Sequence, residues 1–181
     1  TKMVTRCGGF IPNVDRFDPT FFGISGREAA LMDPQQRLLI EAAWEAFENA
    51  GVASEDVAGS NTGVFVGISN CDYTRLLYRD LYDLTAYSAT GTCPSIAANR
   101  ISYLFNLRGP SIALDTACSS SLVSVHLACQ SLLRGESDLC LAGGANLILT
   151  PEGTITFSQA MMMAADGRCK TFDAKADGYG R

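Results

Sequence analysis

The residues best suited to chemistry lie in one short run, residues 115–121, which reads DTACSSS. The segment 111–115 before it is apolar, and so is most of the segment 118–134 after it. We therefore expect a buried strand, a sharp turn of small residues, and a helix that begins at Cys118. Such a turn would lift the Cys118 thiol out of the end of a sheet. The positive end of the helix dipole and its free N–H groups would then favour the thiolate.

A thiolate at this position predicts covalent acyl transfer, with the Cys118 backbone N–H facing the developing oxyanion. The flanking Thr116 and Ser120 differ from the glycines of the hydrolase nucleophile elbow. Cysteine is also a common small buried residue, and the spacing alone leaves both interpretations open. A cysteine hydrolase would need a histidine base. The one histidine, His126, is eight residues further on, about 12 Å along a helix axis, so we expect it to be structural.

The composition limits the classes of protein that remain. The 181 residues are 47% hydrophobic and 18% charged with a net charge of −5, which suits one domain or a large part of one and excludes disorder. No apolar run is long enough to span a membrane. The 14 Lys and Arg residues against 19 Asp and Glu disfavour nucleic acid as a partner.

The seven cysteines are odd in number and contain no C-x-x-C pair, so we expect neither a disulfide framework nor a metal site. The amino-terminal residues lack the apolar stretch of a signal peptide, which favours a cytoplasmic location. Apart from Cys118, we expect the cysteines to be buried thiols.

Strands and helices are expected to alternate along the chain, which predicts an α/β layered fold. Residues 1–32 are expected to be an ordered surface segment pinned to a core. The expected strands are 62–68, 111–115 and 139–145, and the expected helices are near 33–51, 72–82, 95–105 and 118–134.

The helix after residue 33 has the clearest start. Asp33 can cap it, Pro34 suits its first position, and Gln36 can complete a capping box. Gly51 is expected to end it. Its apolar stripe would comprise Leu38, Leu39, Ala42, Ala43, Ala46 and Phe47.

Several motifs together resemble one family. They are DPQQRLLIEAAWEAFENAG, ATGTCPSIAANRISYLFNLRGPS, DTACSSSLVSVHLA, LAGGANLILTPE and DGRCKTFDAKADGYGR. In this order they resemble the ketosynthase domain of modular type I polyketide synthases, over essentially the whole chain. The resemblance implies a thiolase-like layered αβαβα fold. Residues 1–181 would be a partial β-ketoacyl synthase domain, its N-terminal half without the first strand and the C-terminal half.

The resemblance also implies an activity and its partners. Cys118 would take an acyl chain from the phosphopantetheine arm of an acyl carrier protein, and a malonyl-type extender would condense with it after losing carbon dioxide. No cofactor would be bound directly. Phe157 would line the acyl pocket, and the loop 87–95 would meet the second subunit of a homodimer. Asp166, Lys170, Asp173 and Asp177 would form a salt-bridged loop rather than a metal site.

The family's two histidine motifs, HGTGT and N-x-G-H, do not occur in residues 1–181. We therefore expect this piece alone to be inactive in condensation and poorly stable, with an apolar face of the helix 118–134 exposed. The alternative function is a non-catalytic or truncated fragment that acts only as a scaffold or dimer element. A decarboxylase-only variant would carry glutamine in place of Cys118, and TACSSS favours the synthase branch over thiolase itself.

Overall fold

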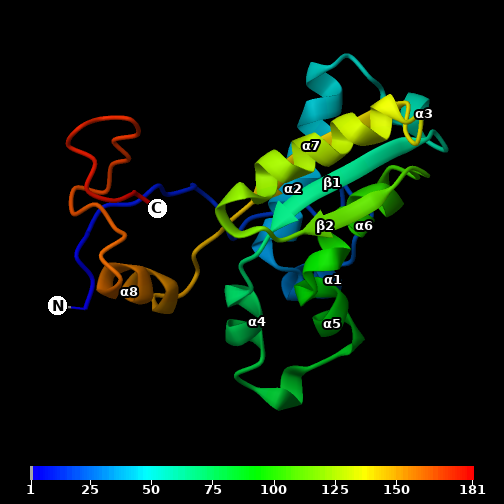
Figure 1. Ribbon diagram of the computed structural model, residues 1–181. Coiled ribbons are helices and arrows are strands. Elements are labelled where there is room, and N and C mark those ends of the chain that lie inside the picture. Colours follow the sequence, from blue (N-terminus) through cyan, green and yellow to red (C-terminus); the bar gives the residue numbers. More distant parts are fainter. Residues whose placement is uncertain (1) are drawn as a thin grey trace. The chain divides into compact units, whose positions relative to one another are not determined.

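The computed structural model describes residues 2–181 as two compact units. The larger unit is Asp15–Leu147, and the smaller unit combines the chain up to Val14 with Ile148–Arg181. Figure 1 shows the elements of both units, and most of them are labelled there.

A parallel sheet forms the centre of the larger unit. Strand β1 (Thr62–Ile68) lies between β2 (Ser111–Leu114) and β3 (Leu139–Ala145). Every residue of β1 is buried, which confirms the strand that its unbroken apolar sequence predicts. Because the three strands are parallel, their carboxyl ends share one edge of the sheet. The segments that follow the strands therefore meet at that edge.

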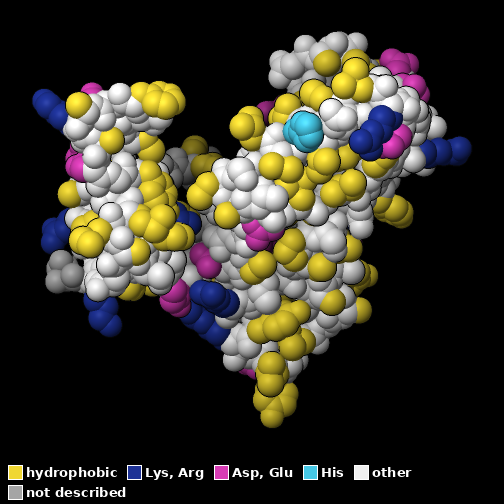
Figure 2. Space-filling model, in the orientation of Figure 1, with side chains coloured by type: hydrophobic (Ala, Val, Ile, Leu, Met, Phe, Trp, Pro, Cys, Tyr) yellow, Lys and Arg dark blue, Asp and Glu magenta, His cyan; other side chains and the backbone are white. Residues whose placement is uncertain are grey.

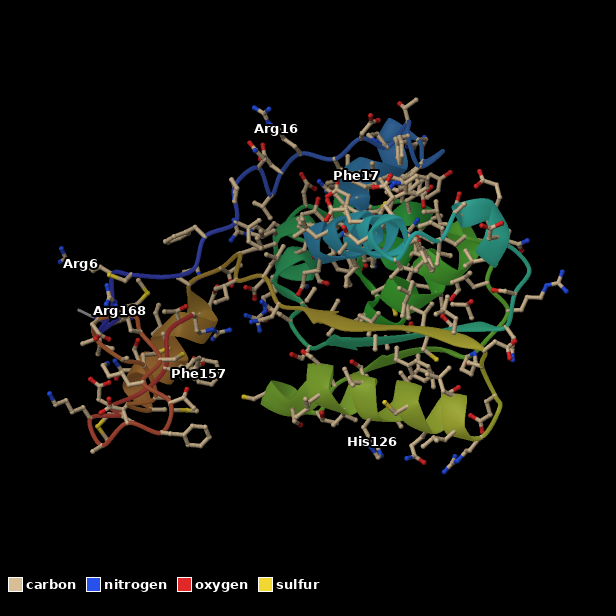
Figure 3. All side chains as sticks on the ribbon, turned by 90° about the horizontal axis from the view of Figure 1, so that it is seen from above. Arg6, Arg16, Phe17, His126, Phe157 and Arg168 are labelled. Carbon is tan, nitrogen blue, oxygen red and sulfur yellow. The ribbon has the colours of Figure 1, made fainter. Side chains whose placement is uncertain are left out.

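Helices cover both faces of this sheet, as the α/β prediction requires. Figure 3 shows α7 (Ser120–Leu133) on one side of the strands and α2 (Pro34–Asn49) on the other. Helix α6 (Pro94–Leu104) packs against β1 and β2 and beside α2, which itself contacts β3. The main hydrophobic core fills the space between these two helices and the sheet, and includes Ile40, Phe47, Val64, Ala98, Ile101 and Phe105. The shorter helices of this unit are α1 (Gly26–Leu31), α3 (Ser54–Val57), α4 (Asp72–Leu77), η1 (Leu81–Asp83) and α5 (Ala86–Thr92).

The amino-terminal end of α2 confirms two expectations and corrects a third. Asp33 caps the helix by accepting from the Gln35 amide at 2.8 Å, and Pro34 occupies its first turn. Gln36 does not close a capping box. Its side chain instead donates to the carbonyl oxygens of Thr90 and Cys93, because the end of α5 and the start of α6 lie within its reach.

The buried stripe of α2 also differs from the expected one. Leu39, Ala43 and Phe47 are buried as expected, together with Ile40, whereas Ala42 and Ala46 are exposed. The stripe is rotated toward Ile40 because that larger side chain removes more apolar surface from water than an alanine does.

Helix α7 begins later than expected, and its two faces differ. A 3-10 turn, Ala117–Ser119, precedes it, so Cys118 lies before the helix rather than in its first turn. The residues it buries toward the sheet are small: Ser120, Ser124, Ala128 and Ser131. Leu122 and Leu133, 76% and 80% exposed, lie on its other side, and Figure 2 shows hydrophobic side chains gathered over this helix. The expected exposure of an apolar face of this helix is therefore confirmed.

The first 32 residues divide between the units. In the larger unit, Phe17, Phe22 and Ile24 pack against the main core, which confirms the expected pinning to a core for residues 15–32 only. In the smaller unit, Gly9 donates its amide to the Arg181 carbonyl at 2.7 Å, and Val4 donates to Ser158 Oγ at the end of α8 (Glu152–Gln159).

The acidic loop of the smaller unit is salt-bridged through three of the four expected residues, whereas the carboxylate of Asp173 accepts from the Lys175 backbone N–H. Lys170 Nζ lies 2.9 Å from Asp166 and 2.7 Å from Asp177. Across residues 2–181, no cluster of three or more His, Cys, Asp or Glu side chains is arranged to hold a metal ion. The helices described for this stretch are also too short or too polar to cross a membrane.

The approach of α7 to the sheet gives a first prediction. A Cβ on Gly67 would lie 2.7 Å from the Ser120 carbonyl carbon, so we expect Gly67→Ala to push α7 away and lower the free energy of unfolding by about 1–3 kcal/mol. Urea denaturation measures this loss. Gly143→Ala, on the neighbouring strand, is the matched control, because a Cβ there has no atom within 4 Å. Equal losses for the two variants would contradict the close approach.

Candidate active site

The run 115–121 forms a tight elbow at the carboxyl edge of the sheet. Strand β2 ends at Leu114, two residues follow without regular structure, and the 3-10 turn brings Cys118 to the entrance of α7. The expected order of strand, sharp turn and helix is confirmed. The thiol belongs to the turn rather than to the helix.

The Ser120 side chain stabilises the elbow through two hydrogen bonds to its backbone. Its hydroxyl accepts from the Thr116 amide at 2.9 Å and donates to the Ala117 carbonyl at 2.7 Å. The residue is only 6% exposed, so water cannot readily replace these bonds. Ser120 therefore ties both sides of the turn together around Cys118.

Two further side chains complete the turn. Asp115 accepts from the Ala117 amide at 2.8 Å, and Ser119 donates to the Thr116 carbonyl at 2.8 Å. Short polar side chains of this kind stabilise turns by bonding to nearby backbone groups. The polar residues around Cys118 thus have a structural use that their sequence order alone does not show.

Ala117 has a left-handed backbone conformation, with a φ of 56°. This region is unfavourable for residues other than glycine, by roughly 1–2 kcal/mol. The residue immediately before the thiol therefore carries local strain, and backbone strain often collects at functional sites. Sequence patterns do not reveal this strain, because alanine is not a residue that turn patterns single out.

Cys118 itself is exposed among the described residues 2–181. The interpretation of Cys118 as a small buried residue is therefore wrong for this part of the chain. Neither its thiol nor its backbone N–H has a hydrogen-bond partner in this part of the chain. An accessible sulfur and an unengaged N–H on one residue are the groups that a nucleophile and an oxyanion donor require.

The expectation that the other cysteines are buried is wrong. Cys140 is half-buried and the rest are exposed: Cys7, Cys71, Cys93, Cys129 and Cys169. The reason why these cysteines are exposed differs between positions in the fold. Cys129 lies on the side of α7 away from the sheet, whereas Cys71 and Cys93 stand at the N-caps of α4 and α6.

The first turn of α7 rests on two glycines at the ends of β1 and β3. A Cβ on Gly144 would lie 2.8 Å from both Ser121 Oγ and the Gly67 carbonyl oxygen. Ser124 donates to the Gly143 carbonyl at 3.0 Å. The elbow is therefore set by direct contact between the start of α7 and neighbouring strand ends.

His126 and Phe157 lie in different surroundings. His126 is exposed on α7 and points away from the sheet in Figure 3; that it is not a base for Cys118 stays a prediction. Phe157, in the smaller unit, is half-buried. Its ring lies 6.1 Å from that of Tyr179, and the Arg181 guanidinium lies over it at 4.8 Å.

Asp33, Gln35 and Gln36, three polar side chains at the start of α2, are all buried, and the helix-cap pattern explains the contacts of Asp33 alone. Asp33 is 3% exposed, and burial raises its pKa despite hydrogen bonds from Gln35 and the charge of Arg37. Gln35 is 1% exposed and makes long-range contacts that the motif DPQQR does not indicate. The helix-cap pattern accounts for Asp33 but provides no signal for Gln35.

The whole chain matches one family model. Residues 1–181 match the model of the β-ketoacyl synthase N-terminal domain, and the chain belongs to this family. Solved ketosynthase structures share this fold over nearly all of the chain, which confirms the thiolase-like layered architecture.

Relatives narrow the class to the ketosynthases of modular polyketide synthases. The chain is 52% identical over 180 residues to a phenolphthiocerol/phthiocerol polyketide synthase polypeptide of Mycobacterium tuberculosis (strain CDC 1551 / Oshkosh), covering 99% of this chain and 12% of that protein. It is 55% identical over 178 residues to a further polypeptide of this synthase, from strain ATCC 25618 / H37Rv, covering 96% and 8%. The chain therefore spans a small part of these relatives.

Solved structures agree with this assignment. A ketosynthase from module 6 of the bacillaene synthase of Bacillus subtilis 168 superposes with a TM-score of 0.89 at 40% identity, covering 98% of this chain and 29% of that one. An oxazolomycin ketosynthase domain from Streptomyces albus JA3453 gives 0.85 at 37% identity, covering 96% and 30%.

The hydrogen bonds of the elbow give a second prediction. We expect Ser120→Ala to lower the free energy of unfolding by about 1–3 kcal/mol, because it leaves the Thr116 amide without its acceptor beneath the turn. Ser119→Ala is the matched control, since this exposed hydroxyl can be replaced by water. Thermal denaturation compares the two, and an equal or larger loss for Ser119→Ala would show that Ser120 is not what holds the turn.

Proposed function

We propose that Cys118 is the acyl-accepting nucleophile of a ketosynthase that extends polyketide chains. The observation that carries this proposal is the exposed thiol on a strained elbow, with its own N–H unengaged, in a chain of the β-ketoacyl synthase family. The acyl chain would arrive as a thioester on the phosphopantetheine arm of an acyl carrier protein. That arm is a substrate carrier, not a bound cofactor.

The first half-reaction needs only groups that the elbow supplies. The Cys118 thiolate attacks the thioester carbonyl, and the oxyanion of the tetrahedral intermediate accepts a hydrogen bond from the Cys118 N–H. Collapse of this intermediate breaks the bond to the carrier sulfur. The carrier leaves as a thiolate and takes up a proton, and the acyl chain remains on Cys118.

The second half-reaction forms the carbon–carbon bond. The malonyl-type extender on its carrier loses carbon dioxide, and the electron pair of the broken bond becomes an enolate. The enolate carbon attacks the acyl-Cys118 carbonyl, and the cysteine thiolate leaves. By resemblance, histidines of the HGTGT and N-x-G-H motifs assist this step, and residues 1–181 contain neither motif.

The proposal extends to a homodimer that uses residues 87–95. These residues form most of α5 and the start of α6, a helical segment rather than the expected loop. Tyr87 at its start is 41% exposed. Sedimentation of the full ketosynthase domain with Tyr87→Glu tests this interface, and an unchanged dimer would contradict it.

Labelling of Cys118 tests the central proposal. The full ketosynthase domain that contains this chain is incubated with an acyl thioester, and the adduct is located by mass spectrometry. We expect one acyl group on Cys118 and none in Cys118→Ala, since the thiolate is the attacking group. Cys129→Ala removes another exposed thiol, which lies on α7, and this variant should be acylated normally at Cys118. An adduct that survives Cys118→Ala would refute the assignment.

Phe157 is proposed to line the acyl pocket. We expect Phe157→Ala to raise KM for long acyl thioesters several-fold more than for acetyl thioesters, because a shortened side chain loses apolar contact with a long chain. Phe172→Ala is the control, since this phenylalanine of the same unit is fully exposed. Steady-state kinetics measure both, and equal effects on long and short substrates would leave Phe157 a packing residue only.

A further inference from the structure

Two side-chain amides join β1 and β3 just beyond the point where their backbone ladder stops. The ladder pairs Thr62 with Leu139 at one end and Ile68 with Ala145 at the other. Beyond it, the Asn70 side chain donates to the Leu147 carbonyl. Asn70 and Leu147 are separated by 77 residues, the same offset as every pair in the ladder, so they lie in the same register, two positions beyond its last pair.

Gln35 completes this connection from α2. Its Oε1 accepts from the Leu147 amide at 3.1 Å, and its Nε2 donates to the Asn70 carbonyl at 2.9 Å. The Leu147 residue is therefore held on both sides, through its N–H by Gln35 and through its C=O by Asn70. We call these three residues the amide clasp.

Asp33, the capping residue of α2, also holds the Gln35 side chain of the clasp in place. Gln35 Nε2 also donates to Asp33 Oδ2 at 3.2 Å, so the carboxylate that caps α2 orients the amide. Gln35 is 1% exposed, and both hydrogens and one lone pair of its amide are used. A buried amide satisfied in this way has one rotamer and one orientation, which makes it a rigid spacer between the two strand ends.

The clasp lies directly next to the support of the elbow. Gly67 and Gly144, the positions against which the first turn of α7 packs, each precede a clasp residue by three positions along the chain, and both clasp residues follow the strand ends. A change in the spacing of the strand ends would move these glycines apart. Ser120 and Ser121, which contact them, would then shift together with the turn that carries Cys118.

We propose that Gln35, acting with Asn70, is a positioning residue for Cys118. It sets the separation of the β1 and β3 ends, these ends set the first turn of α7, and that turn sets the direction of the thiol. Gln35 touches neither substrate nor the reacting atoms. This inference rests on the proposed function of Cys118, because it concerns the rate at which that thiol is acylated.

The test compares two rates at one sulfur in the full ketosynthase domain. Gln35→Met keeps the length of the side chain and removes its hydrogen bonds. We expect kcat for acylation of Cys118 to fall roughly ten- to hundredfold, because displacements of about 1 Å have effects of this size. KM should change less than about threefold, and the alkylation rate of Cys118 by iodoacetamide should stay within about twofold, because the thiol remains exposed.

Ser131→Ala is the matched control. It removes a buried hydrogen bond of 2.8 Å to Ser137 at the opposite end of α7, so it reports general destabilisation without a change at the elbow. Asn70→Ser is a second variant on the less buried side of the clasp, for use where Gln35→Met does not fold. It should lower kcat in the same direction.

The outcomes separate this inference from the function on which it rests. If the unmodified domain acylates Cys118, and Gln35→Met or Asn70→Ser retains the kcat of Ser131→Ala, the positioning role is wrong and the nucleophile stands. A parallel fall in acylation and alkylation would also overturn it, because the thiol itself would then be lost. If the unmodified domain forms no acyl-Cys118, the proposed function fails, and the inference fails with it.

Discussion

The close contact between the first turn of α7 and the ends of β1 and β3 determines the rest of the site. It is possible because Gly67 and Gly144 carry no side chains, and because α7 faces the sheet with serines and an alanine. Small residues on both surfaces let a helix approach a sheet more closely than leucine or valine would permit. The elbow with Cys118 is the part of the chain that joins the two surfaces, so its shape follows from their separation.

The sequence is sufficient to predict the strands and helices whose positions depend on the pattern of apolar residues. Strand β1, a continuous run of apolar and small residues, and the strand–turn–helix order around Cys118 could be predicted, because burial fixes which residues a strand or helix must contain. The cap at Asp33 could be predicted as well, since it depends on local geometry. The spacing left Cys118 open between a nucleophile and a small buried residue; the family resemblance favoured the nucleophile and specified the thiolase-like form of the α/β fold.

Features that depend on distant contacts could not be predicted. Gln36 is expected from the local pattern to bond within its own helix turn, but it bonds to residues 90, 93 and 100, which that pattern does not contain. The exposure of Cys129 depends on which side of α7 faces the sheet. The small residues, not the leucines, take that side, in contrast to the usual amphipathic rule.

The parallel arrangement of β1 and β3 has a consequence for how this site forms. Every backbone pair between these strands closes a chain segment of 77 residues, and such long-range pairing forms slowly because chain entropy must be lost before the contacts are gained. Until β3 joins the sheet, half of the support beneath α7 is missing. The catalytic geometry would therefore appear late in folding, and pulsed hydrogen exchange at the β3 amides during refolding would time its arrival.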